Sequence, residues 1–201
     1  LKVIVHVGPK GFQKVGHICF AYDDIVYSYG NYDSDSFHLN QTIGDGIFFT
    51  VPLEKYIPNM ISAENNSIFE YGIYTTSKQN ALIEKEIEKI RQNGYRWYTK
   101  IEKEDGYDRF SEYEMDYPSR LHYRTGAKLY KVKSGKFHIY WALGDNCASF
   151  TDLVLGTLGA DVLSIRGIIS PGTYLDWLQK EYLKKNSPVV FRCIYKEWDS
   201  E

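Results

Sequence analysis

Hydrophobic and polar residues alternate along several short segments, which is the pattern of half-buried β-strands. Strands are predicted at 1–8, 16–22, 25–29, 47–51, 68–75, 128–132, 137–141 and 189–194; residues 1–5 and 68–75 alternate, whereas 47–51 is an apolar run. The first is followed by Gly8-Pro9-Lys10-Gly11, and Asp23-Asp24 is the turn of a tight antiparallel hairpin predicted at 16–29. Ser134-Gly135 predicts a second hairpin at 127–141. The pattern therefore predicts an antiparallel sheet.

Three other segments have apolar residues at helical spacing. A helix capped by Thr76 or Ser77 and ended by Gly94 carries one apolar face, formed by Ile83, Ile87 and Ile90. A second helix opens at Gly144-Asp145-Asn146-Cys147 and stops at Gly159; its apolar stripe is Phe150, Leu153, Val154 and Leu158. A third helix, at 171–185, has proline in its first turn. The fold class predicted is α+β, with the sheet packed against these helices.

The length of 201 residues favours a single domain spanning 1–201. Residues 95–123 are polar and rich in Tyr, Asp, Glu and Arg without a clear period, so we expect an insertion or a long surface loop there. No run reaches the roughly 18 apolar residues of a membrane helix, which excludes an integral membrane protein. The net charge of −2 argues against nucleic acid as a partner. Because no signal peptide precedes Leu1, we expect that a leader has been removed or that the chain is part of a longer one.

Cys147 is the strongest candidate for chemistry. A thiol in the first turn of a helix faces unpaired backbone N–H groups and the positive end of the helix dipole, and both favour the thiolate. The same N–H groups can hold a developing oxyanion. The alternative is that Cys147 is a small buried hydrophobic residue, which is the commoner fate of a free cysteine.

His17 is the second candidate, because it interrupts an apolar strand directly after Gly16. On its own it is more simply a hydrogen-bonded core or edge histidine. A base within hydrogen-bond reach of a thiol activates it, and a sheet packed against the helix of Cys147 supplies that geometry. The sequence thus predicts a Cys–His pair that only the fold can assemble.

The other histidines and cysteines carry weaker signals. We expect structural or surface roles for His6, His38, His122 and His138. Cys19 shares the sheet face of His17, as a packing residue or a neighbour of the site, and Cys193 is expected in the core. Three cysteines make no disulfide framework, and no metal, phosphate or nucleotide motif is present, so no cofactor is predicted.

Two motifs resemble those of a known family. Gly16-His17-Ile18-Cys19-Phe20, followed by a short turn and the strand at 25–29, and much later Asn146-Cys147-Ala148-Ser149-Phe150 at a helix start, are similar to the circularly permuted branch of the papain-like NlpC-type hydrolases. Lecithin–retinol acyltransferase-like proteins have the same order of histidine strand and cysteine helix. The likeness covers these two short motifs and not the region between them.

The resemblance implies a permuted papain-like fold with Cys147 as nucleophile and His17 as general base. The family has a third polar residue on the following strand that orients the imidazole. Ser28 occupies that position, which departs from the usual His, Asn, Gln or Asp. Because serine orients an imidazole weakly, Tyr29, Asn31 and Asp33 are the alternatives.

The resemblance also implies the class of reaction. Related enzymes include amidases and endopeptidases that cleave the peptides of bacterial peptidoglycan, some of them secreted or delivered as antibacterial toxins to the periplasm of a target cell. For such a toxin a cognate immunity protein that plugs the cleft is expected. One alternative is a lipid-directed acyltransferase, phospholipase or thioesterase, which needs an exposed apolar surface near the site. The other is a catalytically inactive binding module of the same fold.

Overall fold

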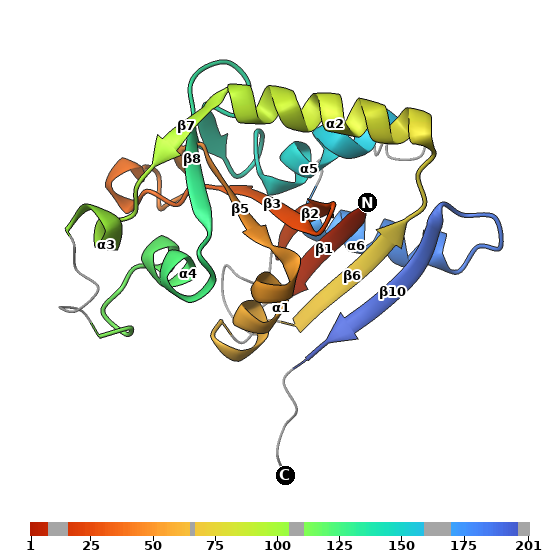
Figure 1. Cartoon of the computed structure of the whole chain (residues 1–201), viewed down its shortest axis with the longest axis horizontal. Coiled ribbons are helices and arrows are strands. Elements are labelled where there is room, and N and C mark those ends of the chain that lie inside the picture. Colours follow the sequence, from red (N-terminus) through yellow and green to blue (C-terminus); the bar gives the residue numbers. More distant parts are fainter. Residues whose placement is uncertain (8–15, 65–66, 105–110, 159–169, 197–201) are drawn as a thin grey trace, which may run out of the picture.

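The centre of the computed structural model is an eight-stranded sheet in which every neighbouring pair is antiparallel (Figure 1). The structure describes residues 1–7, 16–64, 67–104, 111–158 and 170–196. The strands in spatial order are β10 (Val189–Tyr195), β6 (Ser67–Ile73), β1 (Lys2–Val7), β2 (His17–Tyr22), β3 (Ile25–Gly30), β5 (Ile47–Pro52), β8 (Lys128–Val132) and β7 (Gly94–Trp97). A separate two-stranded sheet pairs β4 (Ile43–Asp45) with β9 (Ile139–Trp141).

Helices cover both faces of the large sheet (Figure 1). Their bounds are α1 (Leu53–Ser62), α2 (Ser77–Gln92), α3 (Lys100–Lys103), α4 (Tyr117–Thr125), α5 (Cys147–Leu155) and α6 (Pro171–Tyr182). One face packs against α1 and α4, and the other packs against α2, α5 and α6. The prediction of an α+β fold with an antiparallel sheet is confirmed. Among the described residues, no helix is long and apolar enough to cross a membrane.

Alternation along the strands decides which side chains face which helices. In β1, Ile4 packs toward α1, whereas its neighbours Val3 and Val5 pack toward α5 and α6. In β5, Phe49 belongs to the α1 face and Phe48 to the face of α2 and α5. The central strands are therefore buried on both sides, which explains their nearly continuous apolar sequences.

The predicted hairpin at 16–29 is confirmed, with Phe20 opposite Tyr27 in the β2–β3 ladder. Both turn residues have left-handed backbones, with φ of 50° at Asp23 and 55° at Asp24. A two-residue turn with positive φ at both positions matches the right-handed twist of the strands. Aspartate tolerates that conformation, so the pair Asp-Asp serves where Asn-Gly is commoner.

The hairpin predicted at 127–141 is wrong. The two strands exist, but β8 lies between β5 and β7, whereas β9 pairs with β4. Between them the chain turns away at Phe137, whose φ is 69°, and the His138 ring hydrogen-bonds the carbonyl of Val132 at 2.9 Å. Local alternation identifies strands but not their partners.

The segment 95–123, predicted as an insertion or long loop, contains helices and a strand as well as turns in its described part. Its described residues include part of β7, which extends the large sheet, and helices α3 and α4. Helix α4 is capped by Asp116, whose side chain accepts from the Ser119 N–H at 3.0 Å, and it packs beside α1. The pattern was obscured because α4 is short and rich in tyrosine and arginine.

Helix α1 carries no prediction from the sequence, since Pro52 caps it and Pro58 lies inside it. Cys193 is partly exposed rather than in the core, because β10 is an edge strand. The helix at Cys147 ends at Leu155 and a short 3₁₀ turn follows, and α6 ends at Tyr182. The predicted turn at 8–11 and the helix stop at Gly159 lie outside the described residues.

Candidate active site

Cys147 is the first residue of α5, and the loop before it fixes its position. The Asn146 side chain accepts hydrogen bonds from the backbone N–H groups of Ala148 at 2.9 Å and Ser149 at 3.0 Å. In return the Ser149 hydroxyl accepts from the Asn146 N–H at 2.9 Å, which completes a capping box. The Asn146 amide also donates to the carbonyl of Ala142 at 3.0 Å. The motif Asn-Cys therefore begins the helix and anchors the loop that leads to it.

The Cys147 thiol is buried, and burial raises its pKa to about 11. The backbone N–H groups of Ile18, Ala148 and Cys147 itself hydrogen-bond the sulfur and lower the pKa, but burial outweighs them. The expected helix-start effect is therefore present but is not the dominant one. At neutral pH the resting group is the thiol, not the thiolate.

His17 is the first residue of β2 and lies on the α1 face of the sheet. Its Nε2 is 2.7 Å from the Ser28 hydroxyl oxygen. Burial lowers the pKa of His17 to about 4, so its imidazole is neutral at neutral pH. Gly16, with φ of 77°, precedes it because a Cβ there would lie 2.7 Å from the carbonyl oxygen of His6.

Four residues were considered for the polar group that orients the imidazole, and Ser28 is the one that contacts it. The Tyr29 hydroxyl instead donates to the carbonyl of Phe137 at 3.0 Å, and the Asn31 amide donates to the carbonyl of Gln41 at 2.7 Å. Asp33 accepts from the backbone N–H of Asp35. A further partner of Ser28 was missed: the Tyr32 hydroxyl lies 3.1 Å from the Ser28 oxygen.

Strands β2 and β3 part beside these residues. Their ladder has the pairs Phe20–Tyr27, Ala21–Val26 and Tyr22–Ile25 and no others, although β1 follows β2 as far as His17. The N–H of Ile18, which a longer ladder would direct toward β3, meets the Cys147 sulfur instead. The gap thus brings the cysteine of one face of the sheet next to the strand that carries His17 on the other.

The Cys147 sulfur contacts Ile18, the residue next to His17, but it makes no hydrogen bond with the His17 imidazole. Cys147 packs with Val3 and Ile18 on the α5 and α6 face, whereas His17 hydrogen-bonds Ser28 on the α1 face. Both residues are described, and no hydrogen bond links them. With Nε2 held by Ser28, Nδ1 is the nitrogen of His17 that is free to approach the sulfur. Catalytic hydrogen bonds are often long in a ligand-free enzyme and tighten when substrate binds.

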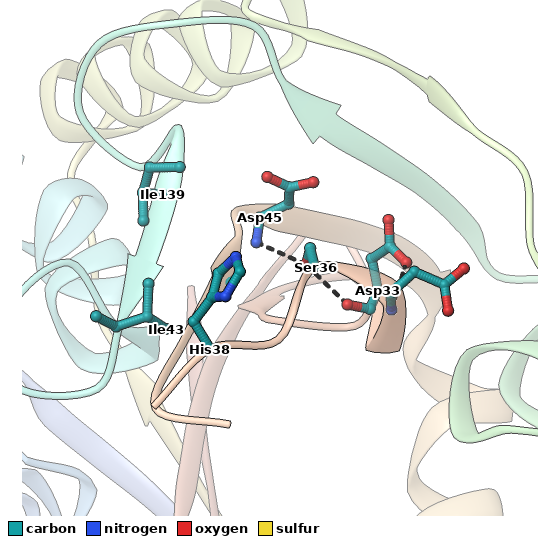
Figure 2. A pocket seen from close by; sticks show the side chains of 8 residues that line it. Asp33, Ser36, His38, Ile43, Asp45 and Ile139 are labelled. Atoms are coloured by element: carbon teal, nitrogen blue, oxygen red, sulfur yellow. Dashed lines mark hydrogen bonds between the residues drawn. The ribbon is translucent and has the colours of Figure 1, made fainter. Parts of the chain in front are cut away.

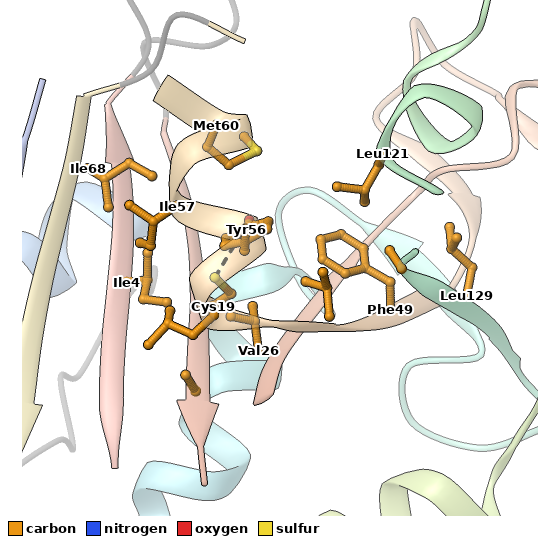
Figure 3. Packing of buried hydrophobic residues seen from close by; sticks show 14 of the residues in the cluster. Ile4, Cys19, Val26, Phe49, Tyr56, Ile57, Met60, Ile68, Leu121 and Leu129 are labelled. Atoms are coloured by element: carbon orange, nitrogen blue, oxygen red, sulfur yellow. Dashed lines mark hydrogen bonds between the residues drawn. The ribbon is translucent and has the colours of Figure 1, made fainter. Parts of the chain in front are cut away.

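A second group of polar side chains packs behind His17, on the α1 side. The His6 ring meets the His17 ring edge to face with centroids 5.6 Å apart, and its Nε2 is 3.1 Å from the Tyr56 hydroxyl. Cys19 lies 3.8 Å from the same hydroxyl (Figure 3). Burial raises the pKa of Cys19 far above its ordinary value. Burial also lowers the pKa of His6, and repulsion from a protonated His17 would lower it further. Cys19 is therefore a packing residue here and not a reactive thiol.

The remaining histidines have the structural roles expected of them. His122 Nδ1 lies 2.8 Å from the carbonyl oxygen of Ala127, and His138 is bound to Val132 as described above. His38 is exposed beside a cavity of about 360 Å³ (Figure 2). That cavity is also lined by the carboxylates of Asp33 and Asp45 and by Ile139. Neither Cys147 nor His17 lines it, so it is separate from the candidate site.

The small sheet brings apolar side chains near the candidate site. Tyr140 of β9 faces inward and packs on Tyr29, with ring centroids 5.7 Å apart, and charge on Cys147 contributes to raising its pKa. On either side of it in sequence, Ile139 and Trp141 are 45% and 48% exposed, and Leu143 in the following loop is 69% exposed. Three exposed apolar residues thus precede Cys147 in the sequence.

The described residues contain no cluster of three or more His, Cys, Asp or Glu side chains arranged to hold a metal ion. No family model matches the chain, and searches of curated proteins and of solved structures likewise find no similar protein. The resemblance to papain-like hydrolases therefore stays a prediction that rests on the two sequence motifs.

Proposed function

We propose that this protein is a cysteine hydrolase in which Cys147 is the nucleophile and His17 the general base. The observation that carries the proposal is that three features lie beside the gap between β2 and β3. These are a thiol at a capped helix start, a neutral imidazole on the adjoining strand, and a hydroxyl that holds the far nitrogen of that imidazole.

The pKa values favour a neutral resting pair over a preformed ion pair. With the pKa of Cys147 near 11 and that of His17 near 4, the proton remains on sulfur until substrate is bound. His17 then accepts this proton through Nδ1 as the sulfur attacks the carbonyl carbon. The reaction requires the thiol and the imidazole to move into hydrogen-bond contact in the substrate complex.

The start of α5 supplies the stabilisation of the intermediate. The Asn146 side chain occupies the N–H groups of Ala148 and Ser149, and the N–H of Cys147, which contacts its own sulfur in the resting state, is the donor that we assign to the oxyanion once the sulfur attacks. His17 returns its proton to the leaving group, and a thioester forms on Cys147. Water attacks this thioester, with His17 as base again, and releases the acid and the free thiol.

The substrate that we propose is the peptide portion of bacterial peptidoglycan, cleaved at an amide bond, as the resemblance implies. A lipid ester is the second candidate, and one observation favours it. The exposed apolar side chains of Ile139, Trp141 and Leu143 closely precede the nucleophile in the sequence, and a lipid-directed enzyme needs an exposed apolar surface near its site.

One experiment separates these readings. Wild type and Cys147→Ala are incubated with purified peptidoglycan and, separately, with phospholipid vesicles, and the products are identified by mass spectrometry. Cys193→Ala is the matched control, since that cysteine lies on an edge strand away from the site. Release of muropeptides, lost in Cys147→Ala and retained in Cys193→Ala, supports the amidase. Deacylated lipid with the same dependence selects the lipid enzyme.

The binding-module reading has its own signature. If neither substrate changes, alkylation of the wild type by iodoacetamide shows whether Cys147 is activated. If Cys147 is alkylated no faster in wild type than in the His17→Gln variant, the proposed catalysis is refuted. An alkylation rate that depends on His17 supports the proposal and directs the search to other acyl substrates.

A further inference from the structure

We propose that Tyr32, acting through Ser28, determines which ring nitrogen of His17 carries the proton, and that it is a positioning residue for the thiol chemistry. The inference rests on the proposed role of His17 as a base. It identifies a residue that the family resemblance does not provide, because the third position here is a serine.

The contacts form a chain of three groups. The Ser28 oxygen lies 2.7 Å from His17 Nε2 and 3.1 Å from the Tyr32 hydroxyl oxygen. Ser28 is fully buried, and its hydroxyl has no other hydrogen-bond partner among the described residues. The orientation of its single proton is therefore decided between His17 and Tyr32.

Gly30 makes the contact with Tyr32 possible. Ser28 and Gly30 lie in β3 and point to the same face, and Tyr32, two residues past the end of the strand, also packs on that α1 face. A Cβ on Gly30 would lie 2.9 Å from Cζ and 3.1 Å from the hydroxyl oxygen of Tyr32. Only glycine therefore lets the tyrosine ring lie back across the strand, where its hydroxyl reaches Ser28.

Neighbouring rings hold Tyr32 in this position. Its ring centroid is 5.4 Å from that of Phe49 and 5.8 Å from that of Tyr117. The Tyr117 hydroxyl is directed elsewhere and lies 3.8 Å from the Met60 sulfur. Tyr117 thus shares the surroundings of Tyr32 but makes no contact with Ser28, which makes it a matched control.

The single proton of Ser28 links the two ends of the chain. If Nδ1 of His17 is to accept a proton from Cys147, Nε2 must carry hydrogen and donate it to Ser28. Ser28 then donates its own proton to the Tyr32 oxygen. Without that oxygen, the proton of Ser28 is free to turn to Nε2, which places the hydrogen of the imidazole on Nδ1. That tautomer cannot act as the base.

The nearby His6 does not offer a second route. Its Nε2 is taken up by the Tyr56 hydroxyl, and its contact with His17 is a ring contact at 5.6 Å, not a hydrogen bond. The polar partner that holds His17 is therefore the Ser28–Tyr32 pair.

The direct test measures the tautomer by NMR of protein labelled with ¹⁵N-histidine at pH 7, with the His17 signals identified from a His17→Gln variant. We expect the Nε2–H form in wild type and in Tyr117→Phe. Tyr32→Phe should shift the tautomer ratio toward Nδ1–H by about fivefold, the effect of losing one neutral hydrogen bond. An unchanged ratio in Tyr32→Phe, or an Nδ1–H form in wild type, overturns the inference.

A second measurement distinguishes this inference from the proposed function. The rate of Cys147 alkylation by iodoacetamide is followed by mass spectrometry, relative to Cys193 as internal reference. His17→Gln should slow it, Tyr32→Phe should slow it by about fivefold, and Tyr117→Phe should leave it unchanged. A rate that His17→Gln does not alter refutes the base role alone, and the NMR result still decides the tautomer. A rate that His17→Gln lowers and Tyr32→Phe does not refutes the role of Tyr32.

A double-variant cycle gives a third readout that a merely structural role would not reproduce. Because Tyr32 acts through Ser28, the Ser28→Ala/Tyr32→Phe double variant should alkylate no more slowly than Ser28→Ala. Independent, multiplicative effects of the two substitutions would contradict the relay. Gly30→Ala, which displaces the tyrosine hydroxyl without removing it, should reproduce the Tyr32→Phe tautomer ratio.

Discussion

Acidification should destabilise the fold through His17, in a way that can be calculated from the structure. Burial lowers the pKa of its imidazole from 6.5 to about 4. Between these values the unfolded chain binds a proton at His17 that the folded protein does not bind. The contribution of His17 to the free energy of unfolding is therefore fully present above pH 6.5, and it is lost as the pH falls toward 4.

The size of the effect follows from the two pKa values. Going from pH 8 to pH 5, linkage gives a loss of about 2 kcal/mol in the free energy of unfolding from His17. The residue is partly exposed at its surface, and solvent there screens the charged form, so about 2 kcal/mol is an upper value. His6 is more fully buried, and its lowered pKa adds a loss of the same sign.

Urea denaturation followed by tryptophan fluorescence at pH 8, 6.5 and 5 measures this loss. Replacing His17 by glutamine removes its titration, so the pH 8 to 5 loss should be smaller in His17→Gln than in wild type by about 1–2 kcal/mol. His38→Gln, which alters an exposed histidine, should keep the wild-type dependence. Parallel curves for wild type and His17→Gln would refute the reasoning, because they would mean that the imidazole titrates alike in the folded and unfolded chains.

Two substitutions test the packing and capping of α5. Phe150 stacks on Tyr29 with ring centroids 5.0 Å apart and meets Phe137 edge to face at 5.3 Å, so Phe150→Ala should lower the free energy of unfolding by about 3–5 kcal/mol in urea titrations. A loss below about 1 kcal/mol would show that the cluster is not closely packed. Asn146→Ala should cost about 1 kcal/mol by removal of the cap, seen as a lower Tm, and Asn146→Asp should recover most of it. Equal Tm values for Asn146→Ala and wild type would contradict the capping role.

The sequence predicted those helices and strands whose caps and buried residues all lie within one short segment. Helix α2 was predicted because its cap at Thr76 and its buried face of Ile83, Ile87 and Ile90 agree. The partners of β8 and β9 were not predicted. Each strand pairs with a strand from elsewhere in the chain, and no residue within 127–141 encodes that choice. Helix α1 was missed because Pro58 interrupts the helical pattern.

The same distinction applies to the candidate site. Cys147 and His17 were identified because a capped helix start and a polar residue in an apolar strand are unusual in a sequence. Ser28 was identified only because the family resemblance implies a polar residue on the following strand. Tyr32 was not, since one tyrosine among 18 carries no signal by itself. The spacing Ser-x-Gly-x-Tyr at 28–32 contained the information, because Gly30 leaves no side chain between the hydroxyls of Ser28 and Tyr32.

The length of the β2–β3 ladder determines which group the Ile18 N–H contacts. One more pair of rungs would satisfy the Ile18 N–H within the sheet and withdraw it from the Cys147 sulfur. Extending the ladder in this way would gain backbone hydrogen bonds, and it would also separate the two faces of the sheet at this point. The open gap is thus a place where the fold forgoes backbone hydrogen bonds, and under the proposed function this is what gives groups on opposite faces of the sheet access to each other.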